Sequence, residues 1–121
     1  MKILIIDDDA FFRKFYAAKL EETGYEVVVA IDGEEGLEKI AKEAPNLILL
    51  DLIMPKKNGF EVMQDIAKNK NIKLCPIIIF STLDQEHDIA EAKELGAVDY
   101  INKESSDWES TLAKISSYMP H

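Results

Sequence analysis

The sequence has a single cysteine, Cys75, and no long hydrophobic run. One cysteine cannot form an internal disulfide, so packing must hold the fold, and Cys75 is expected to be an unreactive apolar side chain. The longest apolar stretches, such as Ile3 to Ile6 and Ile77 to Phe80, are far shorter than the roughly 20 residues that a membrane helix needs. The chain also starts directly with a strand-like stretch rather than a signal peptide. We therefore expect a cytoplasmic protein without membrane insertion.

Basic residues are also few: 14 Lys and Arg stand against 23 Asp and Glu, which gives a formal net charge of −9 at pH 7. Proteins bind nucleic-acid backbones mainly through clustered basic side chains that release counterions. Direct binding to DNA or RNA is therefore not expected. Most of the acidic residues are expected to solvate helix faces, and only a few to carry chemistry.

The length of 121 residues suits one domain, and the 47% hydrophobic content is enough to fill a core. Internal repeats, low-complexity tracts and Gly/Ser linkers are absent from the sequence. We expect one domain over residues 1–121, without an attached effector domain.

Short apolar runs alternate with longer stretches of helical periodicity, which is the pattern of βαβ units around a parallel sheet. The expected strands are Lys2 to Ile6, Glu26 to Ala30, Asn46 to Leu50, Pro76 to Phe80 and Ala97 to Ile101. The first, third and fourth are almost wholly apolar, so they are placed in the middle of the sheet, covered on both faces. The expected helices are Ala10 to Thr23, Glu34 to Glu43, Gly59 to Lys68, Gln85 to Leu95 and Asp107 to Tyr118.

Several helix ends carry boundary signals. Asp32 and Ser106 each stand three residues before a glutamate, which is the spacing of a capping box. Gly24 and Gly96 follow helices where a left-handed residue is favoured. These signals support the predicted ends of four helices.

In an open parallel sheet, ligands bind beyond the carboxyl ends of the strands. The first expected strand runs into Asp7, Asp8 and Asp9, and the third runs into Asp51. If these strands are neighbours, Asp7, Asp8 and Asp51 converge. Clustered carboxylates repel one another, and a hard cation such as Mg²⁺ offsets that repulsion. Helix capping is the other explanation, which we favour for Asp9 but not for Asp8 with Asp51.

Two more polar side chains are expected at this edge of the sheet. Ser81 follows the fourth expected strand, and Lys103 stands two residues after Ile101, where the fifth ends. Alone, such a serine is usually a turn residue and such a lysine a solvated charge. Together with the carboxylates they supply what phosphoryl transfer needs: a nucleophile, a metal site, and a cation and a hydroxyl that bind the developing charge.

Four motifs occur in order along the chain: ILIIDDD, LILLDLIMPKKNGFE, PIIIFST and GAVDYINK. They resemble the successive motifs of response-regulator receiver domains, the family of the bacterial chemotaxis regulator, and the resemblance covers the whole chain. It implies a flavodoxin-like, doubly wound α/β fold with five parallel strands in the order 2-1-3-4-5 and five helices. It also implies a single-domain response regulator of a two-component phosphorelay, a phosphoacceptor switch rather than an enzyme.

The resemblance implies roles for the acidic residues. Asp51 would be the phosphoacceptor. Asp8 and Asp51 would bind Mg²⁺ together with the main-chain carbonyl of Ile53, and Asp7 would help through water or hydrogen bonding. The loop through Asn58-Gly59 matches the one that turns back into the third helix, and Gly59 is expected there for its backbone freedom.

Further roles follow from the same resemblance. Lys103 would contact a phosphoryl oxygen, Ser81 would bond the phosphoryl group once it arrives, and Tyr100 would be the aromatic switch whose rotamer follows Ser81. The phosphoryl group would come from a histidine kinase or a histidine phosphotransfer protein. The signal would leave through the fourth helix, fifth strand and fifth helix, toward a protein target that the sequence does not name.

The chain departs from the family pattern beside the site. Glu104 stands where most of the family has proline, so we expect the loop after Lys103 to be less constrained. Thr82 stands where a smaller residue is common, and the apolar residues Ile53 and Leu83 stand where the family flanks the attacking water. These changes bear on the lifetime of the phosphoryl group rather than on the identity of the site.

Two other functions fit parts of the sequence. A small phosphatase of the haloacid dehalogenase type also forms an aspartyl phosphate, and Asp7 to Asp9 formally contains its D-x-D motif, but the usual cap insertion is absent. A receiver fold that has lost phosphorylation would be an interaction module, and the presence of Asp51 with its neighbours argues against it. Steady turnover of p-nitrophenyl phosphate would favour the phosphatase, and no mass shift after acetyl phosphate treatment would favour the module.

Overall fold

The computed structural model describes residues 1–69, 75–83 and 85–119, in which strands and helices alternate. The strands are β1 (Lys2–Ile6), β2 (Glu26–Ala30), β3 (Leu47–Leu50), β4 (Ile77–Ser81) and β5 (Asp99–Asn102). The helices are α1 (Ala10–Glu22), α2 (Gly33–Glu43), α3 (Gly59–Lys68), α4 (Glu86–Glu94) and α5 (Trp108–Tyr118). None of these helices combines the length and the apolar character that crossing a bilayer requires.

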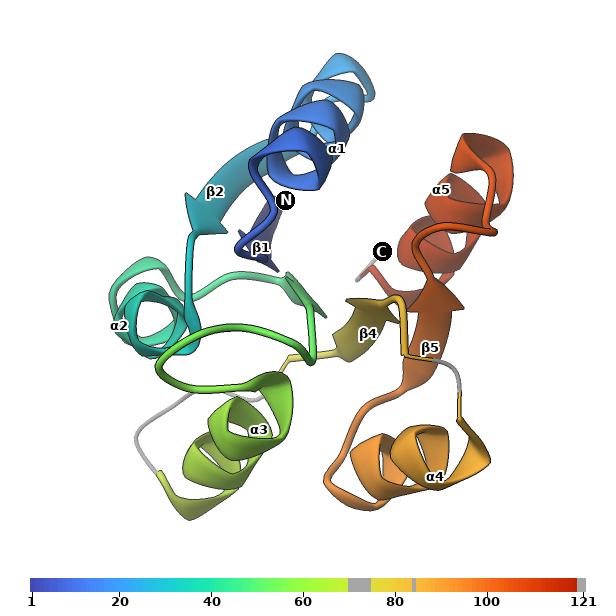
Figure 1. The fold of residues 1–121 in the computed structure, drawn as a ribbon. Coiled ribbons are helices and arrows are strands. Elements are labelled where there is room, and N and C mark those ends of the chain that lie inside the picture. Colours follow the sequence, from blue (N-terminus) through green and yellow to red (C-terminus); the bar gives the residue numbers. More distant parts are fainter. Residues whose placement is uncertain (70–74, 84, 120–121) are drawn as a thin grey trace.

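The five strands form one parallel sheet in the order β2-β1-β3-β4-β5, which confirms the predicted flavodoxin-like topology. Helices α1 and α5 cover one face, and α2, α3 and α4 cover the other (Figure 1). The three central strands are almost entirely buried, whereas β2 and β5 at the edges are partly accessible. Their apolar sequences therefore match their central position.

The core consists of two apolar layers, one on each face of the sheet. In β1, Ile3 and Ile5 pack on the side of α1 and α5, whereas Leu4 and Ile6 pack on the side of the other three helices. Each of these four residues is at most 2% exposed. Because burying one such side chain contributes about 1.5–3 kcal/mol, β1 anchors both layers. The half-buried side chain of Cys75 packs against the apolar layer on the side of α2, α3 and α4.

Three predicted strands differ from the observed ones at their ends, and the third begins at Leu47 rather than Asn46. The fourth ends at Ser81 rather than Phe80, because Ser81 pairs in register with Asn102 of β5. The fifth begins at Asp99, two residues later than predicted. No predicted helix end differs from the observed end by more than one residue.

The predicted caps of α1, α2 and α4 are largely confirmed. Gly24 and Gly96 follow α1 and α4 with φ of 100° and 115°, the left-handed conformation that favours glycine. The Oδ1 of Asp32 accepts the N–H of Glu35 at 2.8 Å and caps α2. The carboxylate of Glu35 accepts the N–H of Ile31 instead of the cap residue, so the capping box is only half formed.

The predicted cap of α5 is wrong by one residue. Ser106 donates its N–H to the carbonyl of Asn102 at 3.1 Å, so it closes the turn after β5. Asp107 is the cap, and its Oδ1 accepts the N–H of Ser110 at 2.7 Å. An aspartate next to the serine competes for the same role, because both residue types cap helices well.

Candidate functional site

The register of β1 and β3 brings two acidic residues together. Ile6 pairs with Leu50, so the next residues, Asp7 and Asp51, lie side by side where both strands end. The N–H of Asp51 donates to the carbonyl of Ile6 at 3.0 Å, which extends the pairing by one residue. Asp7 is 2% exposed and Asp51 is 5% exposed. Asp8, the next residue after Asp7, is exposed.

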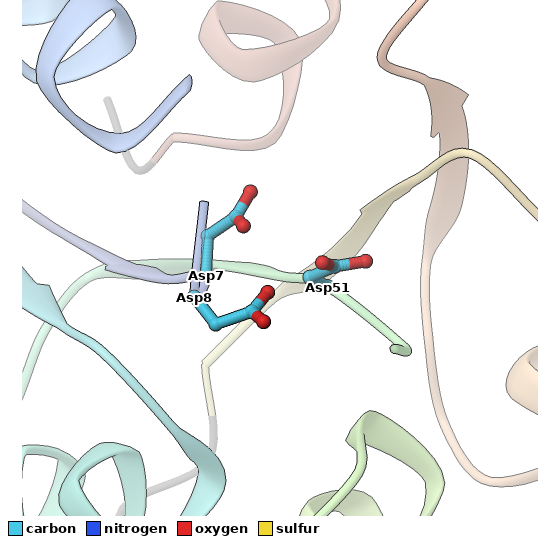
Figure 2. A group of neighbouring side chains, drawn as sticks. All are labelled: Asp7, Asp8 and Asp51. Atoms are coloured by element: carbon cyan, nitrogen blue, oxygen red, sulfur yellow. The ribbon is translucent and has the colours of Figure 1, made fainter. Parts of the chain in front are cut away.

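One oxygen from each of Asp7, Asp8 and Asp51 lies within 4.8 Å of the others. Figure 2 shows the three carboxylates on the same side of the strand ends, with that of Asp8 directed toward Asp51. The predicted convergence is therefore confirmed. Three carboxylates at this spacing form an all-oxygen donor set, which suits a hard divalent cation such as Mg²⁺. We refer to Asp7, Asp8, Asp51 and Lys103 as the acid cluster.

Lys103 places a positive charge between the two buried carboxylates. Its Nζ lies 2.8 Å from Oδ2 of Asp7 and 3.3 Å from Oδ2 of Asp51, and the residue is 7% exposed. Its N–H donates to the carbonyl of Ser81 at 3.1 Å, which extends the pairing of β4 with β5. Strand pairing thus positions the main chain of Lys103, and the two carboxylates position its ammonium group.

Burial and charge shift two pKa values within the acid cluster. Burial raises the pKa of Asp7, and the nearby charge of Asp51 adds to this, against hydrogen bonds from Lys103 and the Asp9 N–H. Burial alone lowers the pKa of Lys103, but the hydrogen bond to Asp7 and the charges of both carboxylates outweigh it, and the net pKa is raised. Lys103 therefore stays charged, while Asp7 holds a proton more tightly than an exposed aspartate does.

The sequence prediction did not include Phe12, whose ring lies against the acid cluster. Lys103 Nζ lies over this ring, 4.7 Å from its centroid. Phe12 is in the first turn of α1, and its N–H donates to the capping Oδ1 of Asp9 at 3.2 Å. The capping role expected for Asp9 is thus confirmed. An aromatic residue on a half-apolar helix gives no sequence signal that separates packing from a contact with a lysine far along the chain.

Ser81 and Tyr100 share a partner in the chain. Ser81 is fully buried, and its Oγ accepts the N–H of Leu83 at 3.3 Å. The half-buried Tyr100 donates its hydroxyl to the carbonyl of Leu83. Both predicted switch residues therefore form hydrogen bonds with the main chain of Leu83. The side chain of Leu83 itself packs against the apolar layer on the α2, α3 and α4 face.

The loop after Asp51 folds closely over it. The N–H of Ile53 donates to Oδ1 of Asp51 at 3.3 Å, while the side chain of Ile53 is 52% exposed. A Cβ on Gly59 would lie 2.4 Å from the carbonyl oxygen of Asp51. Gly59 does not have a positive φ, so the expected reason for this glycine is wrong. The reason is the close approach of α3 to the strand end.

The loop after Lys103 is held by a side chain. Oδ1 of Asn102 accepts the N–H groups of Glu104 at 2.9 Å and Ser105 at 3.2 Å. The first of these donors exists because position 104 is not proline, since proline has no N–H. An asparagine turn therefore restrains the loop after Lys103, where the sequence led us to expect less constraint than a proline gives.

Comparison with known proteins agrees with this geometry. A family model described as the response regulator receiver domain matches residues 3–115. The chain is 44% identical over 108 residues to the "Probable transcriptional regulator ycf27" of Porphyridium aerugineum, covering 89% of this chain and 44% of that protein. It is 40% identical over 108 residues to the "Alkaline phosphatase synthesis transcriptional regulatory protein PhoP" of Bacillus subtilis, with the same coverage of 89% and 44%. The chain thus spans less than half the length of these relatives.

Solved structures resemble the fold along its whole length. The BeF3-activated N-terminal receiver domain of RstA from Klebsiella pneumoniae superimposes with a TM-score of 0.91 at 30% identity, covering 100% of both chains. The chemotaxis protein CheY4 of Vibrio cholerae gives a TM-score of 0.89 at 30% identity, covering 98% of both chains. The site described above therefore stands in a fold shared with these proteins.

Proposed function

The chain belongs to the response regulator receiver domain family, and on that premise we propose that it is a phosphoacceptor switch whose phosphoryl group is carried by Asp51. The observation that carries this proposal is the position of Asp51, next to two further carboxylates and 3.3 Å from the ammonium of Lys103. Asp51 thus has an ammonium group beside it and also belongs to a set of oxygen donors that could bind a metal. Those are the parts that phosphoryl transfer to a carboxylate requires.

In the proposed step, a carboxylate oxygen of Asp51 attacks the phosphorus of a phosphohistidine on a histidine kinase or a phosphotransfer protein. An O–P bond forms, the P–N bond breaks, and the imidazole leaves and takes up a proton. With acetyl phosphate as a small donor, the bond to the acetate oxygen breaks and acetate leaves. Lys103 binds a phosphoryl oxygen and stabilises the charge that develops there.

Asp8, Asp51 and the main-chain carbonyl of Ile53 would hold Mg²⁺ in this proposal, and Asp7 would assist through water or a hydrogen bond. When bound, the ion supplies positive charge that offsets repulsion between the carboxylates and the phosphoryl oxygens. The carboxylate oxygens of Asp7, Asp8 and Asp51, which lie within 4.8 Å of one another, support the acidic part of this assignment. Asp7 also keeps Lys103 beside Asp51 through its 2.8 Å ion pair.

The proposed output runs from Ser81 to Tyr100. Before phosphorylation, Ser81 Oγ accepts the N–H of Leu83, and the carbonyl of Leu83 accepts the hydroxyl of Tyr100. A phosphoryl group on Asp51 gives the Ser81 hydroxyl a new partner. A shift of Leu83 therefore reaches Tyr100 on β5 and the surface of α4, β5 and α5. A protein target that binds one state better shifts the equilibrium, commonly by about 1–3 kcal/mol. We place this signalling in the cytoplasm, without direct nucleic-acid contact by these residues.

The test is the intact mass of the protein after incubation with acetyl phosphate. We expect one phosphoryl group on the wild type with Mg²⁺, much less with a chelator, and none on Asp51→Asn. Asp32→Asn is the matched control, since Asp32 caps α2 outside the acid cluster, and it should be labelled like the wild type. Equal labelling of Asp51→Asn, or an acid-stable product, overturns the assignment. No labelling of the wild type favours the interaction module, and steady turnover of p-nitrophenyl phosphate favours the phosphatase.

A further inference from the structure

The aromatic ring of Phe12 stands against the one buried cation of the acid cluster. Lys103 Nζ lies 4.7 Å from the ring centroid and is also paired with Asp7 and Asp51. The Lys103 side chain is 6% exposed, so this contact is largely shielded from water. A cation over an aromatic face is attracted by the ring quadrupole, and the attraction grows when water is excluded.

The ring is itself held in place by packing. Phe12 stacks on Tyr16 with centroids 6.3 Å apart, and the rings of Tyr16 and Phe80 are nearly perpendicular with centroids 4.6 Å apart. Tyr16 is 5% exposed and Phe80 is 2% exposed, so both belong to the apolar layer under α1 and α5. The ring beside Lys103 therefore belongs to an aromatic row that runs from Phe80 on β4 through Tyr16, and it also contacts the ring of Phe11.

We propose that Phe12 is a positioning residue for Lys103, whose ring keeps the ammonium directed at Asp51 while the charges around it change. The proposal rests on the proposed function, and it adds a residue that no motif of the sequence pointed to. Asp7 and Asp51 hold Lys103 only as long as they are free carboxylates. A cation bound by those oxygens competes with the ammonium, and phosphoryl transfer converts the Asp51 carboxylate into an acyl phosphate.

The ring differs from the carboxylates in one respect that matters here. Its attraction for the ammonium changes neither when metal binds nor when the phosphoryl group arrives. The ammonium therefore keeps one fixed partner through the step in which its other partners are exchanged. Lys103 can then follow the charge from the Asp51 carboxylate to the phosphoryl oxygens without turning out to solvent.

A second lysine and phenylalanine pair on α1 provides an internal control. Lys19 Nζ lies 5.8 Å from the ring centroid of Phe15, which is 39% exposed. This pair is farther apart, more accessible to water and outside the acid cluster. Phe15→Leu removes a ring that also packs on Tyr16, with the same change in side-chain volume, but it removes no contact of Lys103.

The kinetic test compares Phe12→Leu, Phe12→Tyr and Phe15→Leu with the wild type, using acetyl phosphate and Mg²⁺. We expect Phe12→Leu to lower the maximal rate constant for phosphoryl uptake roughly 3- to 30-fold, with little change in the acetyl phosphate concentration that gives half of that rate, because Lys103 acts on the charge that develops during transfer. Phe12→Tyr keeps an aromatic face and should restore most of the rate, and Phe15→Leu should match the wild type. If Phe12→Leu does not fold, Phe12→Met replaces it as the variant without a ring.

A second readout needs no phosphodonor. Protons on the terminal methylene of Lys103 lie near the face of Phe12 and should show upfield NMR shifts from the ring current, lost in Phe12→Leu and kept in Phe12→Tyr. A wild type that accepts no phosphoryl group defeats the proposed function, while the NMR shifts still report the contact. If Phe12→Leu accepts the phosphoryl group as fast as the wild type, the proposed role of Phe12 is overturned. Equal slowing in Phe12→Leu and Phe12→Tyr also overturns it, because the ring face would then not matter.

Discussion

Asp7 and Asp32 follow neighbouring strands at the same edge of the sheet, and both are nearly buried, with 2% and 6% exposure. Their surroundings shift their pKa values in opposite directions. Burial raises the pKa of Asp7, which lies beside Asp51. The N–H of Glu35 at the start of α2 lowers the pKa of Asp32, and the charge of Lys56 adds to this. Low exposure therefore does not decide the behaviour of a carboxylate: the donors and charges around it do.

The cations of the two regions differ in the same way. Lys103 has a 6% exposed side chain between two carboxylates, whereas Lys56 is 61% exposed and lies 3.5 Å from Asp32. The α2 cap formed by Asp32, Glu35 and Lys56 gives one carboxylate both backbone and lysine partners. The acid cluster instead brings three carboxylates together and pairs one lysine with two of them, which is unfavourable without further positive charge. The contrast is consistent with the metal site proposed for the acid cluster.

The largest expected effect is that of removing the buried cation. In the absence of Mg²⁺, Lys103→Met should lower the free energy of unfolding by about 3–5 kcal/mol, because it leaves buried like charges without a partner. Lys56→Met should change the free energy little, since the pair it breaks is open to water. Urea denaturation at neutral pH measures both variants. Equal losses in the two variants would show that burial of the cation is not what distinguishes the two regions.

The next largest effect is expected from Mg²⁺, which should stabilise the protein through the acid cluster and not through the α2 cap. Mg²⁺ at about 100 times its dissociation constant should raise the free energy of unfolding by about 2.7 kcal/mol, because it binds the folded state. A chelator should reverse this gain. Asp8→Asn should lose most of it, and Asp32→Asn should keep it. Thermal unfolding with and without Mg²⁺ measures the gain, and a gain that survives in Asp8→Asn would contradict the assignment of the site to the acid cluster.

Most of the fold could be predicted from the sequence, because strands that are buried on both faces are continuous apolar runs. The apolar runs of β1, β3 and β4 predicted three central strands, and all three are central. Local competition was harder to read. Ser106 and Asp107 are both good caps, and only the hydrogen bond from Ser106 to Asn102 decides between them. Similarly, Asn58 and Glu61 form a complete capping box on α3 that the sequence prediction missed, having treated Asn58 only as part of the preceding loop.

The candidate site was predictable where strand ends determine it. Asp7, Asp8 and Asp51 could be placed together once their two strands were taken as neighbours, and the register confirms this. The ring beside Lys103 could not be predicted, because Phe12 reaches Lys103 only through the way α1 approaches the end of β5, and no local spacing encodes that approach. The turn at Asn102 is local, since its donors stand two and three residues later, but the sequence prediction did not consider it.

A smaller effect is expected from pH, with opposite signs for the two aspartates. The pKa of Asp7 is raised above 3.8, so just above pH 3.8 the folded state holds more protons than the unfolded chain. Its contribution to stability is therefore fully present below pH 3.8 and is lost as pH rises through the raised pKa. The pKa of Asp32 is lowered below 3.8, so its contribution is present above pH 3.8 and is lost as pH falls through the lowered pKa.

Denaturation of the wild type, Asp7→Asn and Asp32→Asn from acid to neutral pH, without divalent cations, measures this difference. The stability of the wild type relative to Asp7→Asn should fall as pH rises, and its stability relative to Asp32→Asn should increase. Asparagine also caps helices, so the second variant keeps the α2 cap while it loses the titrating group. Slopes of the same sign would contradict the opposite pKa shifts.

The smallest expected effect on stability comes from removing a side chain that accepts main-chain N–H groups. Asn102 accepts two N–H groups after Lys103, much as Asp32 accepts one at α2. Asn102→Ala should lower the free energy of unfolding by only about 0.5–1.5 kcal/mol, because water can replace the lost acceptor in an exposed turn. The rate of phosphoryl uptake should fall more than this loss suggests, because the turn fixes the residue that follows Lys103. Asn102→Asp keeps the acceptor and should preserve both stability and rate, whereas a loss of stability in Asn102→Ala with no loss of rate would mean that the β4–β5 pairing alone positions Lys103.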